Sequence, residues 1–329
     1  MKRGAHMSAE LPASLRFAAV DIGSHAVRLL LSRVFTDESV HVFKKESLVR
    51  MPLRLGEEVF RSDFISADKK KQLIGTMIGF RHLMEAYGAL DHLACATSAM
   101  REARNGQDVA DEVRATSGIA LEIIDGGREA EIICLGRPEG WLNPDEVHLF
   151  IDVGGGSTEI TLFAGLEKVA ACSFDIGGIR ILEDLVPKGR WDDMKAWVRE
   201  TTRPYRPVIS IGSGGNINKI FRLARKKEGA RISYKALRDM YAYLSSFTLE
   251  ERVRLLGLRP DRADVIIPAS EIYLSVMKWA RSKSMRVPMV GLSDGLIHIL
   301  FERHLRGGPA ANPDPAGVSN VSSSIDSAA

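Results

Sequence analysis

The chain has 329 residues, which at about 150 residues per domain is enough for two domains. With 45% hydrophobic and 26% charged residues it has the composition of a folded globular protein, which excludes a largely disordered chain and a disulfide-stapled miniature. The 45 lysines and arginines exceed the 42 aspartates and glutamates by too little for a protein whose whole surface binds nucleic acid.

Targeting and cysteine signals point to a cytoplasmic protein. Apolar runs such as residues 17–20 and 266–269 end well short of the roughly 20 residues of a membrane span, and the N-terminus lacks the apolar core of a secretory signal. The three cysteines lie far apart in apolar stretches, as reduced thiols do, and the eight histidines show no metal-ligand spacing. We therefore expect no membrane partner, no nucleic-acid partner and no His/Cys metal centre.

Two segments of the chain resemble each other, residues 17–31 and 149–163. Each contains an apolar strand that ends in Asp-x-Gly, a tight turn of small residues and a second apolar strand. The two aspartates, Asp21 and Asp152, are separated by about one domain length. The repeat predicts two sister domains of one topology.

The segments after each hairpin continue in parallel, first with a third strand and then with alternating helices and strands. Such alternation is typical of an α/β fold. The predicted elements are strands at 40–49, 93–97 and 121–124 and a helix around 73–84 in the first half, then strands at 168–174 and 208–211 and helices at 179–185, 192–200 and 216–226 in the second.

Proline, glycine and asparagine gather between residues 137 and 145, where we expect the domain boundary. The predicted organisation is an N-terminal extension over 1–14, one domain over 15–136 and a second over 137–306, whose last helix can pack back on the first domain. Residues 307–329 contain almost no large apolar side chain and are expected to form a disordered tail.

Three glycine-rich turns are candidate phosphate sites, because backbone N–H groups free of neighbouring Cβ atoms can surround an anion. Asp152, which precedes the second turn, can hold a divalent cation or orient a water molecule. Each turn taken alone is equally compatible with a tight turn that binds nothing. The candidate phosphate-binding residues are Gly23, Ser24 and His25 in the first turn, Gly154, Gly155, Gly156, Ser157 and Thr158 in the second, and Gly212, Ser213, Gly214 and Gly215 in the third.

Two further residues could act on a phosphate between these turns. Arg101 follows a predicted strand end closely, and its planar guanidinium suits phosphate oxygens, although most arginines are simply solvated. Glu129 follows the turn Asp125-Gly126-Gly127, where it could accept a proton from an attacking water or could only complement a helix dipole.

The ordered set of motifs resembles the exopolyphosphatase and guanosine pentaphosphate phosphohydrolase family, in a short form without its C-terminal helical domain. The resemblance implies the ribonuclease H-like fold of actin, Hsp70, sugar kinases and acetate kinase, with two sister domains and a cleft between them. It rests on D-I-G-S-H-A-V-R-L-L (21–30), R-L-G-E (54–57), A-T-S-A-M-R-E-A-R-N (96–105), G-G-R-E-A-E (126–131), D-V-G-G-G-S-T-E (152–159), D-I-G-G-I-R (175–180) and I-G-S-G-G-N-I (211–217).

By this resemblance Glu129 is the catalytic glutamate, Arg101 binds a phosphate, and Asp21 and Asp152 flank a site for Mg²⁺ or Mn²⁺. The implied activity is hydrolysis of the terminal phosphate of inorganic polyphosphate. The alternatives are hydrolysis of the 5′ phosphate of guanosine pentaphosphate, a non-catalytic alarmone-binding or nucleotide-binding regulator, and an actin-like or sugar-kinase-like ATP user. A homodimer is also compatible with the family.

A run of basic residues around the third turn favours a polymeric substrate. Such a cluster is usually a solvated helix face, but it could also guide a long polyanion. The predicted track consists of Arg203, Arg206, Lys219, Arg222 and Lys226.

Overall fold

The computed structural model describes residues 14–36, 41–136, 141–227 and 229–307. The predicted N-terminal extension and the predicted tail lie outside these residues except for Ser14 and Gly307, and the predicted domain boundary borders the gap at 137–140. Within the described ranges, no helix is both long enough and apolar enough to cross a membrane.

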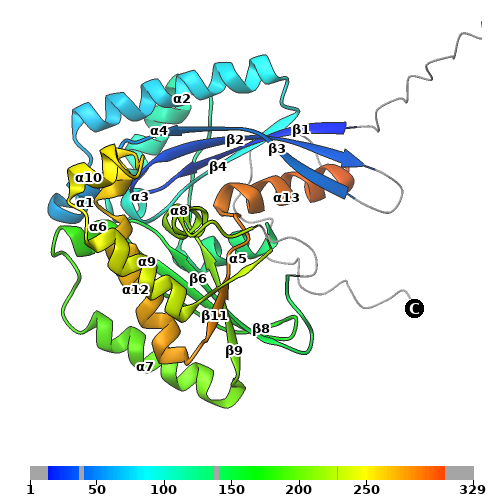
Figure 1. The fold of residues 1–329 in the computed structure, drawn as a ribbon. Coiled ribbons are helices and arrows are strands. Elements are labelled where there is room, and N and C mark those ends of the chain that lie inside the picture. The colour runs from blue at the N-terminus through cyan, green and yellow to red at the C-terminus, as the bar shows by residue number, and fades with distance from the viewer. Residues whose placement is uncertain (1–13, 37–40, 137–140, 228, 308–329) are drawn as a thin grey trace, which may run out of the picture.

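The first sheet has five strands in the order β3-β2-β1-β4-β5 (Figure 1). Strands β1, β2 and β3 form an antiparallel meander, β4 runs parallel to β1, and β5 runs parallel to β4. Their bounds are β1 Ser14–Ile22, β2 Val27–Thr36, β3 His41–Met51, β4 Asp91–Ala96 and β5 Glu122–Ile123. The strands predicted in the first half are thereby confirmed to within a few residues.

The second sheet repeats this arrangement and adds one strand. Its order is β10-β11-β9-β6-β7-β8, so that β8-β7-β6-β9-β11 reproduces the antiparallel meander and the two parallel strands of the first sheet. The bounds are β6 Val147–Val153, β7 Thr158–Ala164, β8 Glu167–Phe174, β9 Val208–Ser213, β10 Arg231–Ser233 and β11 Ser284–Arg286. The predicted α/β fold with two halves of one topology is confirmed.

Helices cover the outer faces of both sheets. Long helix α2 shows why: Leu73, Met77, Phe80 and Met84 form one buried stripe, as the predicted helical spacing requires. The helices of the first half are α1 Leu55–Ser62, α2 Ala67–Tyr87, α3 Ser98–Glu102, α4 Gly106–Ser117 and α5 Gly126–Leu135. Those of the second half are α6 Gly178–Leu182, α7 Arg190–Thr202, the 3₁₀ helix η1 Arg203–Tyr205, α8 Gly215–Leu223, α9 Tyr234–Ser245, α10 Leu249–Arg254, α11 Pro260–Ala263, α12 Ile266–Ala280 and α13 Leu292–Leu305.

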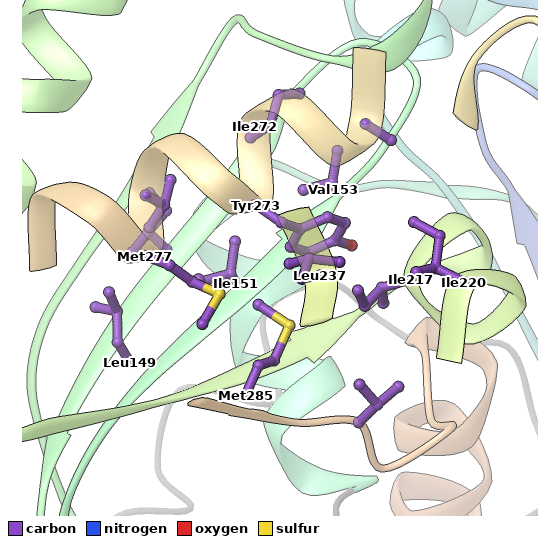
Figure 2. Close-up of a cluster of buried hydrophobic side chains, with 14 of the residues drawn as sticks. Leu149, Ile151, Val153, Ile217, Ile220, Leu237, Ile272, Tyr273, Met277 and Met285 are labelled. Atoms are coloured by element: carbon purple, nitrogen blue, oxygen red, sulfur yellow. The ribbon is translucent and has the colours of Figure 1, made fainter. Parts of the chain in front are cut away.

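Three hydrophobic clusters hold these layers together. One lies in the second half, where fully buried Tyr273 and Met277 of α12 pack against β6 and α8 (Figure 2). A second lies under α2 and α4 on one face of the first sheet. The third joins the two halves, because α5 and α13 bury Phe17 of the first sheet together with Phe150 of the second.

Helices α5 and α13 approach each other through two glycines, Gly136 and Gly295. A Cβ on Gly295 would lie 1.7 Å from the carbonyl oxygen of Ile132, and one on Gly136 would lie 2.6 Å from the backbone nitrogen of Gly295. Only residues without a Cβ allow this backbone contact. The contact also positions the first turn of α5, which carries Glu129.

We expect Gly295→Ala to lower the free energy of unfolding by about 1–3 kcal/mol, because the added methyl group overpacks the α5–α13 contact. The matched control is Gly75→Ala within α2, where an added Cβ meets no atom within 4 Å and should stabilise the helix by up to about 1 kcal/mol. Denaturant unfolding of both variants measures the difference. Equal stabilisation by both substitutions would contradict the packing described here.

Candidate active site

All three predicted glycine turns meet at one large cavity between the two halves of the molecule. The cavity has a volume of about 1370 Å³. Its lining includes Gly23, Ser24 and His25 after β1, Gly154, Gly155, Gly156 and Ser157 after β6, and Gly214 and Gly215 after β9. Because β6 and β9 are parallel, their turns emerge at the same edge of the second sheet.

The two hairpin turns have the same internal hydrogen bond. The backbone nitrogen of Gly23 donates to Ala26 at 3.1 Å, and that of Gly154 donates to Ser157 at 3.0 Å. The turns also lie against each other, since a Cβ on Gly155 would be 3.2 Å from the Cβ of Ser24. The repeat seen in the sequence therefore brings two equivalent turns face to face.

Arg180 of α6 fixes the second turn against the first half. Its Nε donates to the carbonyl oxygen of Gly156 at 2.8 Å, and its guanidinium pairs with Glu102 and lies 4.0 Å from the ring centroid of Phe60. A Cβ on Gly156 would lie 2.3 Å from the Phe60 ring. Residues of both halves thus determine where the backbone of this turn lies.

Three carboxylates converge beside these turns. Glu129 comes from the first turn of α5, Asp152 from the end of β6 and Glu159 from the start of β7, and one oxygen atom of each lies within 4.8 Å of the others. Asp152 and Glu159 are paired across the β6–β7 hairpin, which places them side by side. We call these three residues the acidic trio.

Burial and the charges of neighbouring carboxylates raise the pKa of each member of the trio, and for Asp152 the neighbouring carboxylate is Asp21. Burial is the main cause in all three. Together with the charge of Asp152 it raises the pKa of Glu159 to about 7, and it raises the pKa of Asp152 to about 6 although Ser213 opposes the shift. The pKa of Glu129 is raised well above its ordinary value by burial and by the charges of Glu159 and Asp152.

The acidic trio fits a divalent cation. Oε1 of Glu159 accepts a hydrogen bond from Ser173 at 2.8 Å, but Oε2 of Glu129 and Oε2 of Glu159 are buried without a partner among the described residues. Unpartnered carboxylate oxygens close together are the ligands that Mg²⁺ and Mn²⁺ prefer. A cation there would favour the charged form of the three carboxylates and so oppose the rise of their pKa values.

The two metal residues predicted from the sequence, Asp21 and Asp152, both line the large cavity but have different partners. Asp152 belongs to the acidic trio, but Oδ2 of Asp21 accepts a hydrogen bond from Nη1 of Arg28 at 2.6 Å. In the first hairpin Asp21 is paired with Arg28 across β1 and β2, in the same register as Asp152 and Glu159 in the second. An arginine therefore supplies the positive charge for Asp21.

Positive side chains line another part of the same cavity. Within the described residues, the guanidinium of Arg262 has no ion pair within 4 Å, and its Nη2 lies 3.0 Å from where a Cβ of Gly215 would be. Burial, followed by the charges of Arg50 and Arg28, lowers the pKa of Arg262 to about 10. The cationic cluster consists of Arg28, Arg50, Lys219, Arg222, Arg259 and Arg262.

Several predicted site residues do not line this cavity. Nη1 of Arg101 donates to the carbonyl oxygen of Ile124 at 2.7 Å, and the hydroxyl of Thr158 donates to Ile176 at 2.6 Å. The hydroxyl of buried Ser213 donates to Val290 at 3.0 Å, and Gly212 lies under Met285. Thr158 and Ser213 thus hold neighbouring backbone in place. Arg101 lies close enough to the acidic trio for its charge to lower the pKa of Glu129 and of Glu159.

The predicted basic track is divided. Lys219 and Arg222 line the cavity, Lys226 lies beyond the end of α8, and Arg203 and Arg206 line a separate, smaller cavity. The physical reason is the length of β9, whose six residues span about 20 Å, so that residues before and after it lie at opposite ends of the strand.

The sequence analysis missed Glu159 and four of the cationic residues. Glu159 could have been found, because a four-residue turn after Val153 pairs Asp152 with Glu159 across the hairpin. The contribution of α11 and the residue before it, Arg259 and Arg262, depends on tertiary packing for which the sequence carries no local signal.

Comparisons with known proteins show the family to which the chain is similar. A model of the Ppx/GppA phosphatase family matches residues 38–304. Exopolyphosphatase 1 of Mycobacterium tuberculosis is 27% identical over 305 residues, which cover 86% of this chain and 87% of that protein. Exopolyphosphatase 2 of the same organism is 27% identical over 280 residues, covering 76% of this chain and 86% of the relative.

Solved structures share the fold. An exopolyphosphatase from Cytophaga hutchinsonii has a TM-score of 0.76 at 22% identity, covering 90% of this chain and 100% of that one. The Ppx/GppA family member of Aquifex aeolicus has a TM-score of 0.68 at 20% identity, covering 89% and 99%.

We expect Asp152→Asn to weaken the binding of Mn²⁺ by at least about tenfold, since even residues that only support a metal ligand typically contribute 10–100-fold. Asp145→Asn, an exposed aspartate just before β6, is the matched control and should leave the affinity unchanged. Calorimetric titration with Mn²⁺ measures both. Equal affinities of the two variants would exclude the acidic trio as the cation site.

Proposed function

The chain belongs to the Ppx/GppA phosphatase family, and we propose that it is an exopolyphosphatase that hydrolyses the terminal phosphoanhydride of inorganic polyphosphate with Mg²⁺ or Mn²⁺. The observation that carries this proposal is the charge arrangement of the cavity, which Glu129 and Asp152 of the acidic trio line together with the cationic cluster. A cation on the trio and a run of phosphates along the cluster would complement both.

Glu129 is the proposed general base. Its carboxylate lies beside Asp152 and Glu159, and Glu129 lines the large cavity, where it could accept a proton from a water molecule next to the phosphate. In the reaction the oxygen of a water molecule bonds to the terminal phosphorus, a water proton passes to Glu129, and the bridging P–O bond breaks. The products are inorganic phosphate and a chain one phosphate shorter.

Asp152 and Glu159 are the proposed ligands of the cation. When bound, the cation supplies positive charge to the phosphate oxygens on which negative charge develops. The turns at Gly23 and Gly154 line the same cavity. Those of their backbone N–H groups that are not used inside the turns could orient the terminal phosphate, because glycine has no side chain to obstruct them.

The cationic cluster is the proposed site for the next phosphates of the chain. Lys219, Arg222 and Arg262 have no ion pair among the described residues, so their charge is available to a ligand. Arg28 and Arg50 are paired with Asp21 and Asp261 and hold the base of the cluster in place. Together they suit a polyanion better than a single phosphate.

Guanosine pentaphosphate is the second candidate substrate, and a specific observation favours it. The cavity continues past the charged region to Phe43, Leu142, His298 and Phe301, where the ring centroids of Phe43 and His298 are 3.7 Å apart. A nucleobase can pack on such a surface, whereas inorganic polyphosphate has no apolar part. Release of phosphate from each substrate by the purified protein decides between them.

We expect Glu129→Gln to lower kcat for phosphate release by about 10²–10⁴-fold, the usual contribution of a general base, while the affinity for polyphosphate is retained. Glu131→Gln on the same helix is the control, because Glu131 is exposed and pairs with Lys168 at 2.8 Å. Steady-state kinetics and equilibrium binding measure the two effects. Unchanged turnover in the Glu129→Gln protein would contradict the proposal, and so would the absence of turnover in the parent protein with Mg²⁺ present. If the parent protein bound polyphosphate without turnover, a non-catalytic regulator would be favoured.

A further inference from the structure

A second cavity lies in the second half of the molecule, at the ends of α7 and α12. Its volume is about 390 Å³. We call it the basic pocket, and it is lined by Arg199, Glu200, Arg203, Arg206, Lys278, Trp279 and Arg281. Three elements contribute to it, α7, η1 with the residue after it, and α12, so the pocket depends on the fold and not on one helix.

The basic pocket is separate from the large cavity. Arg206 precedes β9, whereas Gly214 and Gly215 of the large cavity follow it. The six residues of β9 span about 20 Å. A ligand that reached both cavities would therefore have to be longer than about 20 Å, which excludes a nucleotide and admits a polymer.

The charge of the basic pocket is not balanced by the protein. Five cationic side chains face one carboxylate, that of Glu200, and within the described residues none of the five has an ion pair within 4 Å. Two helix C-termini lie nearby, and each carries only about half of a negative charge. After the carboxylate and the two helix ends are counted, roughly three positive charges in the pocket remain without a negative partner.

The walls of the pocket are fixed by packing. Trp279 lies edge-on to Trp191 with ring centroids 6.1 Å apart, and Nη2 of Arg206 donates to the carbonyl oxygen of Trp279 at 3.5 Å. Nε of Arg206 is buried without a partner among the described residues. A buried guanidinium nitrogen without an acceptor costs free energy, and an anionic ligand that approaches this group would reduce the cost.

We propose that the basic pocket binds a distal segment of inorganic polyphosphate while the end of the same chain lies in the large cavity. The inference rests on the proposed function for its substrate. Binding at two sites makes the second contact intramolecular, so affinity rises for chains that span the distance and does not change for chains that are too short. The pocket therefore makes the protein selective for long chains.

The test is a double charge reversal, Arg203→Glu with Lys278→Glu, at two exposed residues that the proposed chemistry does not use. We expect KM for polyphosphate of several hundred residues to rise at least tenfold, with kcat/KM for tripolyphosphate unchanged. The difference should shrink as salt is added, because exposed charges are screened. The neutral double substitution Arg203→Gln with Lys278→Gln should show a smaller rise of KM in the same direction. It tests the same inference if the charge-reversed protein does not fold.

The matched control is Lys71→Glu with Arg114→Glu, an equal change of charge at exposed residues of α2 and α4 in the first half. It should leave both KM values unchanged. An unchanged KM for the long chain in both pocket variants, or an equal rise in the control, would overturn the inference.

The proposed function can fail separately from this inference. Absence of phosphate release from tripolyphosphate by the parent protein would contradict the proposed function alone. The inference would then be decided by a binding titration with long-chain polyphosphate, monitored by tryptophan fluorescence. Loss of affinity in the Arg203→Glu, Lys278→Glu protein supports the inference, and an affinity equal to that of the parent overturns it.

Discussion

The active site depends on one electrostatic contrast between two hairpins of the same geometry. In the first hairpin the cross-strand partner of Asp21 is Arg28, and the two form an ion pair of 2.6 Å. In the second hairpin the partner of Asp152 is Glu159, and α5 adds a third carboxylate from Glu129. Like charges this close are unfavourable unless a positive ion joins them, so these three carboxylates are suited to a bound cation.

The rest of the structure keeps this arrangement in place. Helix α5, which carries Glu129, is held against α13 by a contact that only glycine permits at position 295, and α13 itself packs between the two sheets. Arg180 holds the turn at Gly156 from the other side. The cationic cluster lines the same cavity as Glu129 and Asp152, so the site offers one region suited to a cation and another suited to an anion, which is compatible with the phosphatase family to which the chain belongs.

The features of the fold and the site that could be predicted from the sequence are those with a local sequence pattern. The apolar strands and the glycine-rich turns predicted the two sheets, their repeat and the three turns of the cavity. These features could be predicted because strands and turns depend on residues that are neighbours in the sequence. The ion pair of Asp21 with Arg28 was not predicted, because it forms across a hairpin and depends on the register of two strands. The grouping of Arg262 with Lys219, and the separation of Arg203 from both, follow from tertiary packing and strand length, which no short motif encodes.

The most direct test of the account is to locate the cation in crystals grown with Mn²⁺ by its anomalous scattering. The account predicts one strong peak between the carboxylates of Asp152 and Glu159, within reach of Glu129. A strong peak at Asp21 instead, or crystals saturated with Mn²⁺ that show no peak at the acidic trio, would contradict it.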